Sequence, residues 1–148
     1  MKKILLVVFA CIFIAFAVRE GGVYWHQLKW KSANISHYQF HLSIVCFCSF
    51  TFDRPSFPTI EVQDGKIVSI TDEKGRVITK ENEFYSTFAI TIDDFFSRLH
   101  SLYVLIAGDV AVKYDPTYGF PSYIRIDRNT HFSDDERTFY ISEFEVLP

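Results

Sequence analysis

The clearest alternation of apolar and polar positions begins at Tyr38 and continues to Phe52. A period of two is typical of a half-buried β-strand, because successive side chains point to opposite faces. Pro55 and Pro58 end the run, so we expect one long strand with an apolar and a mostly polar face. The apolar parity consists of Tyr38, Phe40, Leu42, Ile44, Cys46, Cys48, Phe50 and Phe52.

The next pattern, TIEVQDGKIVSIT at residues 59–71, predicts a β-hairpin. Two β-branched runs flank Asp64-Gly65, and this dipeptide is a strong hairpin signal. A strict two-residue turn would pair Val62 with Ile67 and would turn the later apolar positions to the other face. A bulge at Gly65 would correct that by one residue, and the sequence is compatible with either arrangement.

The strongest helical pattern covers residues 90–108, where an apolar stripe recurs at three- and four-residue spacing. Thr91 is placed to cap the first turn, and Asp94 stands three residues later in a capping-box position. Gly108 is expected to end the helix. The stripe consists of Ile92, Phe95, Phe96, Leu99, Leu102, Tyr103 and Ile106.

A shorter helix is expected within residues 24–33, where Trp25 and Leu28 would line one side. Asn34 and Ser36 are the expected breakers. Residues 79–88 have no clear periodicity and are expected to form a connecting loop.

Three further strands are expected at residues 110–114, 123–127 and 139–146. The element order is then helix, three strands, helix, three strands, which suggests a pseudo-repeat without a repeat of residues. With 148 residues, of which 49% are hydrophobic, the chain can form one well-packed domain. We predict an α+β fold: an antiparallel sheet of about six strands with two helices packed on one face.

The N-terminus has two lysines followed by an uninterrupted apolar run, Ile4–Val18. This run is short for a membrane span, which needs about 20 residues, and suits the apolar region of a signal peptide. Ala-Phe-Ala at residues 15–17 has the small-x-small pattern of a cleavage site. We therefore expect residues 1–17 to be removed as a signal peptide, leaving residues 18–148 as a single domain. An uncleaved N-terminal anchor is the alternative.

Charge narrows the range of partners. The formal net charge is −3 and there is no basic block, which argues against nucleic acid. We expect an exported protein, periplasmic or associated with the cell envelope. Contact with the membrane is expected only through the N-terminal segment, if it is uncleaved or is lipidated at Cys11. No cofactor is expected.

Four residues within a short stretch, His37, His41, Cys46 and Cys48, resemble a metal-binding set. On a straight strand, however, the two histidines face one way and the two cysteines the other, so we expect no metal site. A disulfide between the cysteines is expected instead, although alternate strand residues are about 6.5–7 Å apart, near the limit of disulfide geometry. Buried free thiols and a redox-active pair remain alternatives.

The segment YDPTYGFP, residues 114–121, predicts a tightly specified corner between two strands. Asp115 and the proline after it favour a type I turn, and Gly119 can supply the positive φ that follows. Tyr118 and Phe120 alternate, so one ring would pack inward while the other stands in solvent. An exposed aromatic side chain on a rigid turn is a good contact anchor.

The candidate contact residues are therefore Asp115, Tyr118 and Phe120, together with Asp134 and Asp135 in the acidic loop that follows. No G-x-S-x-G nucleophile motif is present, and no catalytic residue is assigned. These five side chains are the binding surface that the sequence predicts.

Several segments together resemble a known family. YDPTYGFP is followed by IRID and then DDE, and it is preceded by CFC, VQDGKIVSI and TIDDFF. From about Trp30 to Phe144, the chain resembles a bacterial family catalogued only as a domain of unknown function, number 6174. The resemblance implies an exported or lipid-anchored bacterial domain and implies no activity.

We expect an uncharacterised exported domain that acts as a binding or interaction module of the bacterial cell envelope. Its partner would be an envelope protein or a small ligand. The alternative is an envelope enzyme or a redox-active protein that uses Cys46 and Cys48. A deep pocket lined by converging His, Asp or Tyr side chains would favour the enzyme.

Overall fold

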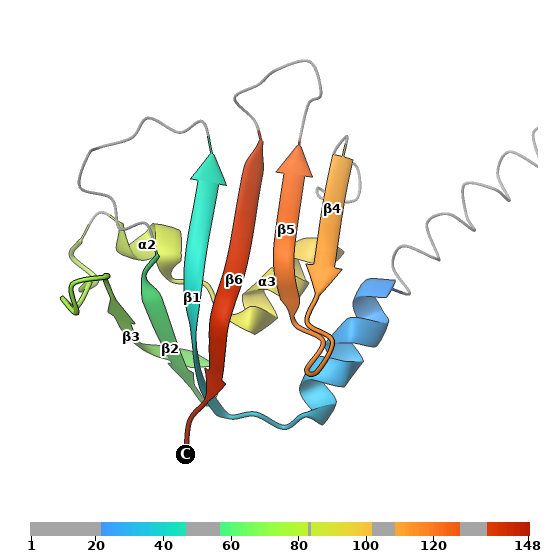
Figure 1. Ribbon diagram of the computed structural model, residues 1–148, viewed down its shortest axis with the longest axis horizontal. Coiled ribbons are helices and arrows are strands. Elements are labelled where there is room, and N and C mark those ends of the chain that lie inside the picture. Colours follow the sequence, from blue (N-terminus) through green and yellow to red (C-terminus); the bar gives the residue numbers. More distant parts are fainter. Residues whose placement is uncertain (1–21, 47–56, 83, 102–108, 128–135) are drawn as a thin grey trace, which may run out of the picture.

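A central antiparallel sheet organises the computed structural model, which describes residues 22–46, 57–82, 84–101, 109–127 and 136–148 (Figure 1). Its strands follow the order β3-β2-β1-β6-β5-β4, so that β1 and β6 lie at the centre. The predicted α+β class is confirmed. The strands are β1 (His37–Cys46), β2 (Thr59–Gln63), β3 (Lys66–Thr71), β4 (Asp109–Tyr114), β5 (Pro121–Asp127) and β6 (Arg137–Val146).

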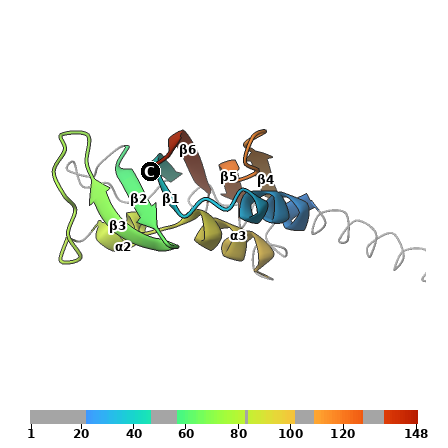
Figure 2. The same ribbon diagram turned by 90° about the horizontal axis from the view of Figure 1, so that it is seen from below.

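Helices pack on one side of this sheet (Figure 2). They are α2 (Tyr85–Phe88), α3 (Ile92–His100) and a helix at residues 22–32, which we call the N-terminal helix. The α2 turn falls where the sequence predicted only a loop. Its Phe88 is fully buried, and Phe84, Tyr85 and Ala89 pack against the core beside it, so apolar contacts order this connection.

Strand β1 has the predicted alternation. Tyr38, Phe40 and Leu42 are at most 2% exposed and face the helices, whereas His37 and His41 lie on the opposite face. The two faces differ because only one of them is covered by helices. The part of the predicted strand beyond Cys46 lies outside the described residues.

The β2–β3 hairpin has the strict two-residue turn that the sequence allowed, whereas the predicted bulge at Gly65 is wrong. Val62 pairs with Ile67 across a two-residue turn in which Asp64 and Gly65 both have positive φ. The register then shifts, and the extra residue is Val68, not Gly65. Val68 is 51% exposed, and Ile70 beyond it returns to the core face, where it is 1% exposed.

Helix α3 begins as predicted. The Thr91 hydroxyl accepts a hydrogen bond from the Asp94 amide, and the Asp94 carboxylate accepts one from the Thr91 amide, which completes a capping box. The helix ends earlier than predicted, at His100, because Ser101 has an extended backbone. The expected stop at Gly108 lies outside the described residues.

In the N-terminal helix, the two side chains that the sequence predicted to line one side, Trp25 and Leu28, face solvent. Val23 and Trp30 are buried at 7% and 4% exposure, whereas Trp25 and Leu28 point away from the sheet. The chain turns at Asn34, which has a φ of 51° and ends this segment where the sequence placed a breaker. Trp30 fixes which side of the helix faces inward.

An aromatic cluster joins the N-terminal helix to the sheet. The Trp30 ring meets Tyr38, Phe120 and Phe144 edge-on, at centroid distances of 5.3, 6.0 and 5.8 Å. Phe120 and Phe144 are 4.6 Å apart. Such aromatic pairs are each worth about 0.5–1.5 kcal/mol beyond the burial of their area. The cluster therefore holds β1, β6, the segment just before β5 and the N-terminal helix together.

Candidate functional site

The chain turns at residues 114–121 where the sequence predicted a corner, but the main-chain bond that closes the turn joins Gly119 to Asp115 and is one residue longer than in the predicted type I turn. One Asp115 carboxylate oxygen accepts hydrogen bonds from the amides of Thr117 and Tyr118, at 2.9 and 2.6 Å. The Gly119 amide donates to the Asp115 carbonyl at 3.0 Å, and the Asp115 amide donates to the Phe120 carbonyl at 2.8 Å. Asp115 is thus occupied in holding the turn together.

The corner is also the surface on which the N-terminal helix docks. Gly119 has a φ of +85°, and a Cβ atom there would lie 2.9 Å from the His26 carbonyl oxygen and 3.0 Å from the Lys29 Cβ. Lys29 Nζ also donates a hydrogen bond to the Pro116 carbonyl at 2.5 Å. Glycine is therefore required twice at position 119, for its backbone conformation and for the close approach of the helix.

The separation that the sequence predicted for the two aromatic side chains of the corner is only partial, because Tyr118 packs against the core and does not stand in solvent. Phe120 is the inward ring. It is 3% exposed and belongs to the core, so its place among the predicted contact residues is wrong. The Tyr118 ring is half-buried and packs on Phe144 at 5.4 Å. Phe120 turns inward because Trp30 and Phe144 offer it an apolar site.

Other predicted site residues are only partly described. Asp134, Asp135 and Cys48 lie outside the described residues. Cys46 is 7% exposed and ends β1 on the face that the helices cover. The Cys46–Cys48 disulfide therefore stays a prediction. The two histidines of the same stretch lie on the opposite face, in agreement with the parity argument.

Next to the corner, the His26 ring stacks on Tyr114 with centroids 3.8 Å apart and planes 4° from parallel. Its Nδ1 atom is buried and has no hydrogen-bond partner among the described residues. Burial, followed by the charge of Lys29, lowers the pKa of His26. A neutral imidazole therefore closes this edge of the sheet.

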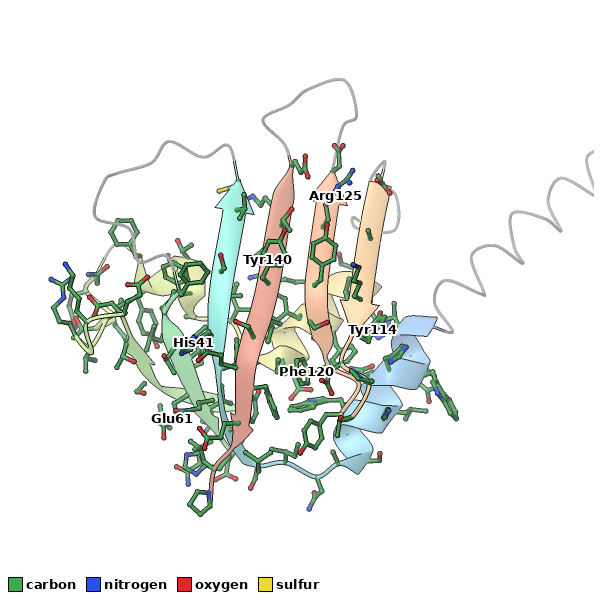
Figure 3. All side chains as sticks on the ribbon, in the orientation of Figure 1. His41, Glu61, Tyr114, Phe120, Arg125 and Tyr140 are labelled. Atoms are coloured by element: carbon green, nitrogen blue, oxygen red, sulfur yellow. The ribbon has the colours of Figure 1, made fainter. Side chains whose placement is uncertain are left out.

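No described element covers the other face of the sheet, which we call the open face (Figure 3). Its side chains come from the polar parity of the central strands and include His41, Glu61, Arg125 and Tyr140. The side chains of β1, β2 and β3 form pairs with one another or with glutamates of β6, whereas several other polar groups of β4, β5 and β6 have no partner among the described residues. The two halves must therefore be considered separately.

A hydrogen-bonded chain crosses the first half. Ser69 Oγ donates to one Glu61 oxygen at 2.9 Å, and His37 Nε2 lies 2.9 Å from the other. His37 Nδ1 is 2.9 Å from the main-chain oxygen of Pro148. Hydrogen bonding to Glu61 raises the pKa of His37, and the same bond lowers the pKa of Glu61. The serine contacts the carboxylate and not the imidazole, so this chain is no nucleophile–base pair.

Two more pairs lie beside this chain. His41 Nδ1 is 3.4 Å from a Glu143 oxygen, and the Gln39 side-chain amide donates to Glu145 at 2.8 Å. In the ranges that the structure describes, no three His, Cys, Asp or Glu side chains converge to hold a metal ion. The pairs hold β1 against β2 and β6 across the uncovered side.

The second half carries what we call the tyrosine cluster: Lys113, Tyr123 and Tyr140. The two rings meet at 5.3 Å, and Lys113 Nζ lies 5.6 Å from the centre of the Tyr123 ring. Tyr140 is 45% exposed. Among the described residues, neither phenol hydroxyl has a hydrogen-bond partner and Lys113 has no carboxylate partner.

Arg125 lies beside the tyrosine cluster and is already neutralised. Its guanidinium contacts Asp109 at 3.0 Å and Glu136 at 3.2 Å. These pairs are exposed, so they contribute little to stability. Because Asp109 and Glu136 pair with Arg125, no described carboxylate compensates the ammonium group of Lys113.

The sequence analysis missed the tyrosine cluster. A signal was present, since Tyr123 and Tyr140 each occupy a position of the polar parity on an alternating strand. Large aromatic side chains on a solvent-facing parity are candidates for contacts. What the sequence does not contain is the strand order that places the two rings side by side.

Two clefts border the N-terminal helix. A polar cleft of about 350 Å³ separates it from α3 and includes one carboxylate, Asp93, and one ammonium group, Lys31. A second, more apolar groove of about 500 Å³ lies on the outer side of the helix, at Trp25, Leu28, Lys29 and Ser32. Neither contains the converging His, Asp or Tyr side chains that would favour an enzyme.

These features define an α+β domain with one helix-covered and one open sheet face. The model of a family of unknown function, DUF6174, matches residues 25–146. The chain belongs to this family. No curated protein matches it. The match spans β1 to β6 and the corner, and it begins within the N-terminal helix.

The helix-docking role of Gly119 predicts an unequal response of two glycines to the same substitution. Gly119→Ala should lower the free energy of unfolding by about 2–3 kcal/mol, because positive φ and steric overlap with the helix act together. The control is Gly65→Ala: φ there is +72°, but no atom lies within 4 Å, so the expected cost is about 1 kcal/mol. Urea unfolding measures both, and equal losses would contradict the docking role.

The His37–Glu61 pair predicts a specific shift in titration. Glu61→Gln should lower the pKa of His37, whereas Glu143→Gln should leave it unchanged; NMR titration of the imidazole protons measures both. A raised histidine pKa stabilises the fold below about pH 6.5, and this contribution is lost as pH rises through the folded pKa. A lowered Glu61 pKa stabilises it above about pH 4.3, so the pair contributes most between these values. A His37 pKa that is insensitive to Glu61→Gln would contradict the pairing.

Proposed function

We propose that this protein is an exported protein-binding domain of the bacterial cell envelope. We further propose that it holds its partner on the tyrosine cluster. The observation that supports this function is the pair of tyrosine rings, whose hydroxyls have no partner among the described residues, on a sheet face that no described element covers. Tyrosine presents a large, rigid contact area with a polar tip and loses little conformational entropy on binding.

The chemistry of the cluster favours a protein partner. Small-ligand sites are concave, and both clefts that we describe lie at the N-terminal helix, away from Tyr123 and Tyr140. The rings suit an apolar side chain, and the ammonium of Lys113, which pairs with no carboxylate in the described part of the chain, suits a carboxylate of the partner. We therefore infer a partner segment that carries an apolar side chain next to an Asp or a Glu.

Export rests on the N-terminal sequence alone. The lysines and the apolar run Ile4–Val18 support a signal peptide cleaved after Ala17, with residues 18–148 as the mature domain and an uncleaved anchor as the alternative. Among the described residues, no helix combines the length and the apolar character needed to cross a membrane. A disulfide between Cys46 and Cys48 belongs to the same proposal, because an exported protein meets oxidising conditions.

Site-specific photocrosslinking tests the binding surface in the cells that make the protein. A benzophenone side chain replaces Tyr140 in one variant and Phe57 in a control, since Phe57 is comparably exposed at 52% but lies next to β2. We expect a discrete protein adduct at position 140 and none at position 57. Tyr140→Ala should then weaken binding of the identified partner by about 30-fold while the melting temperature stays unchanged.

Lys113→Glu supplies the electrostatic control. It should weaken binding by about tenfold and remove most of the salt dependence. If position 140 yields no adduct, or if position 57 yields the same adduct, the tyrosine cluster is not the binding surface.

A further inference from the structure

The outer side of the N-terminal helix carries an apolar stripe that no described element covers. Trp25 is 70% exposed, Tyr24 57% and Leu28 42%. Trp25 is the most exposed large hydrophobic side chain in the described part of the chain. Ser32 continues the stripe one turn beyond Leu28, and the apolar groove of about 500 Å³ lies along it.

Lysines border this stripe on both sides. With 3.6 residues per turn, Lys29 falls just beyond Trp25 around the helix and Lys31 just beyond Tyr24. Both lysines are exposed. Tryptophan and tyrosine prefer the boundary between lipid headgroups and acyl chains, and flanking lysines suit the phosphate layer. The stripe therefore has the composition of a helix that lies in a membrane interface.

The position of the helix in the chain supports the same occupant. The apolar run Ile4–Val18 ends only four residues before Gly22, where the described helix begins. Four residues span at most about 14 Å. In the uncleaved chain, which is the alternative to cleavage after Ala17, a run that has inserted into a bilayer would thus hold the stripe within reach of that bilayer's surface.

We propose that the N-terminal helix lies flat in the headgroup region of a phospholipid bilayer, with Tyr24, Trp25 and Leu28 directed toward the acyl chains. The corner at Gly119 and the buried Trp30 set the rotation of the helix, so the stripe faces away from the domain. This contact is separate from the tyrosine cluster, which lies on the open face of the sheet. The domain would therefore hold a membrane and a protein partner at the same time.

Tryptophan scanning of the full chain in phosphatidylcholine vesicles tests the proposal. The chain has two tryptophans, and Trp30 is buried, so Trp25→Phe leaves an internal reference. In that background, Leu28→Trp and Ser32→Trp place a reporter along the stripe, and Val68→Trp places a control on β3, where the native side chain is 51% exposed. Lipids brominated near the headgroup quench tryptophans that enter the bilayer.

We expect the reporters at positions 25, 28 and 32 to be quenched similarly, by about twofold or more, and the reporter at position 68 to be unaffected. Aqueous acrylamide should show the opposite order. Quenching that fades from position 25 to position 32 would mean that the helix is only tethered and does not lie flat. Protection of the stripe from both quenchers would mean that a second copy or another protein covers it, and either result overturns the proposal.

Discussion

The fold depends on one close approach between backbones, where the N-terminal helix crosses the corner at Gly119. A Cβ atom at position 119 would lie only 2.9 Å from the His26 carbonyl oxygen. Packing at this distance leaves almost no freedom in how the helix sits. The direction in which every side chain of the helix points follows from this contact.

Two surfaces result from that constraint. Trp30 enters the aromatic cluster and joins the helix to β1, β6 and the corner before β5, which places Trp25 on the opposite side. Because all the described helices pack on one side of the sheet, the other side keeps its polar parity and its tyrosines in solvent. The packing of the helices on one side of the sheet therefore leaves an apolar stripe on the N-terminal helix and an open face on the other side of the sheet.

The sequence was sufficient to predict those parts of the fold that depend on interactions between residues close together in the chain. The alternation in β1, the Asp64-Gly65 turn and the Thr91–Asp94 capping box depend on spacings of two to four residues, and all were predicted. The positive φ of Gly119 was predicted for the same reason. The packing of the N-terminal helix on Gly119 was not predicted, since this helix lies about ninety residues earlier in the chain.

Features that depend on distant partners were missed. Phe120 is buried because Trp30 and Phe144 surround it, and the sequence shows neither contact. The bulge at Val68 depends on the packing of β3, because it turns Ile70 toward the core. The tyrosine cluster forms because β5 and β6 are neighbours and pair Tyr123 with Tyr140. The sequence of either strand alone does not show this pairing.

Native-state hydrogen exchange tests most directly whether the N-terminal helix is an integral part of the domain. The account predicts that the amides of Lys29 and Trp30 exchange with the same free energy as those of Phe40 and Ile141 in the central strands. All four would then open only when the whole domain unfolds. Exchange of the helix amides at a free energy near zero, as in a frayed terminus, would contradict the account.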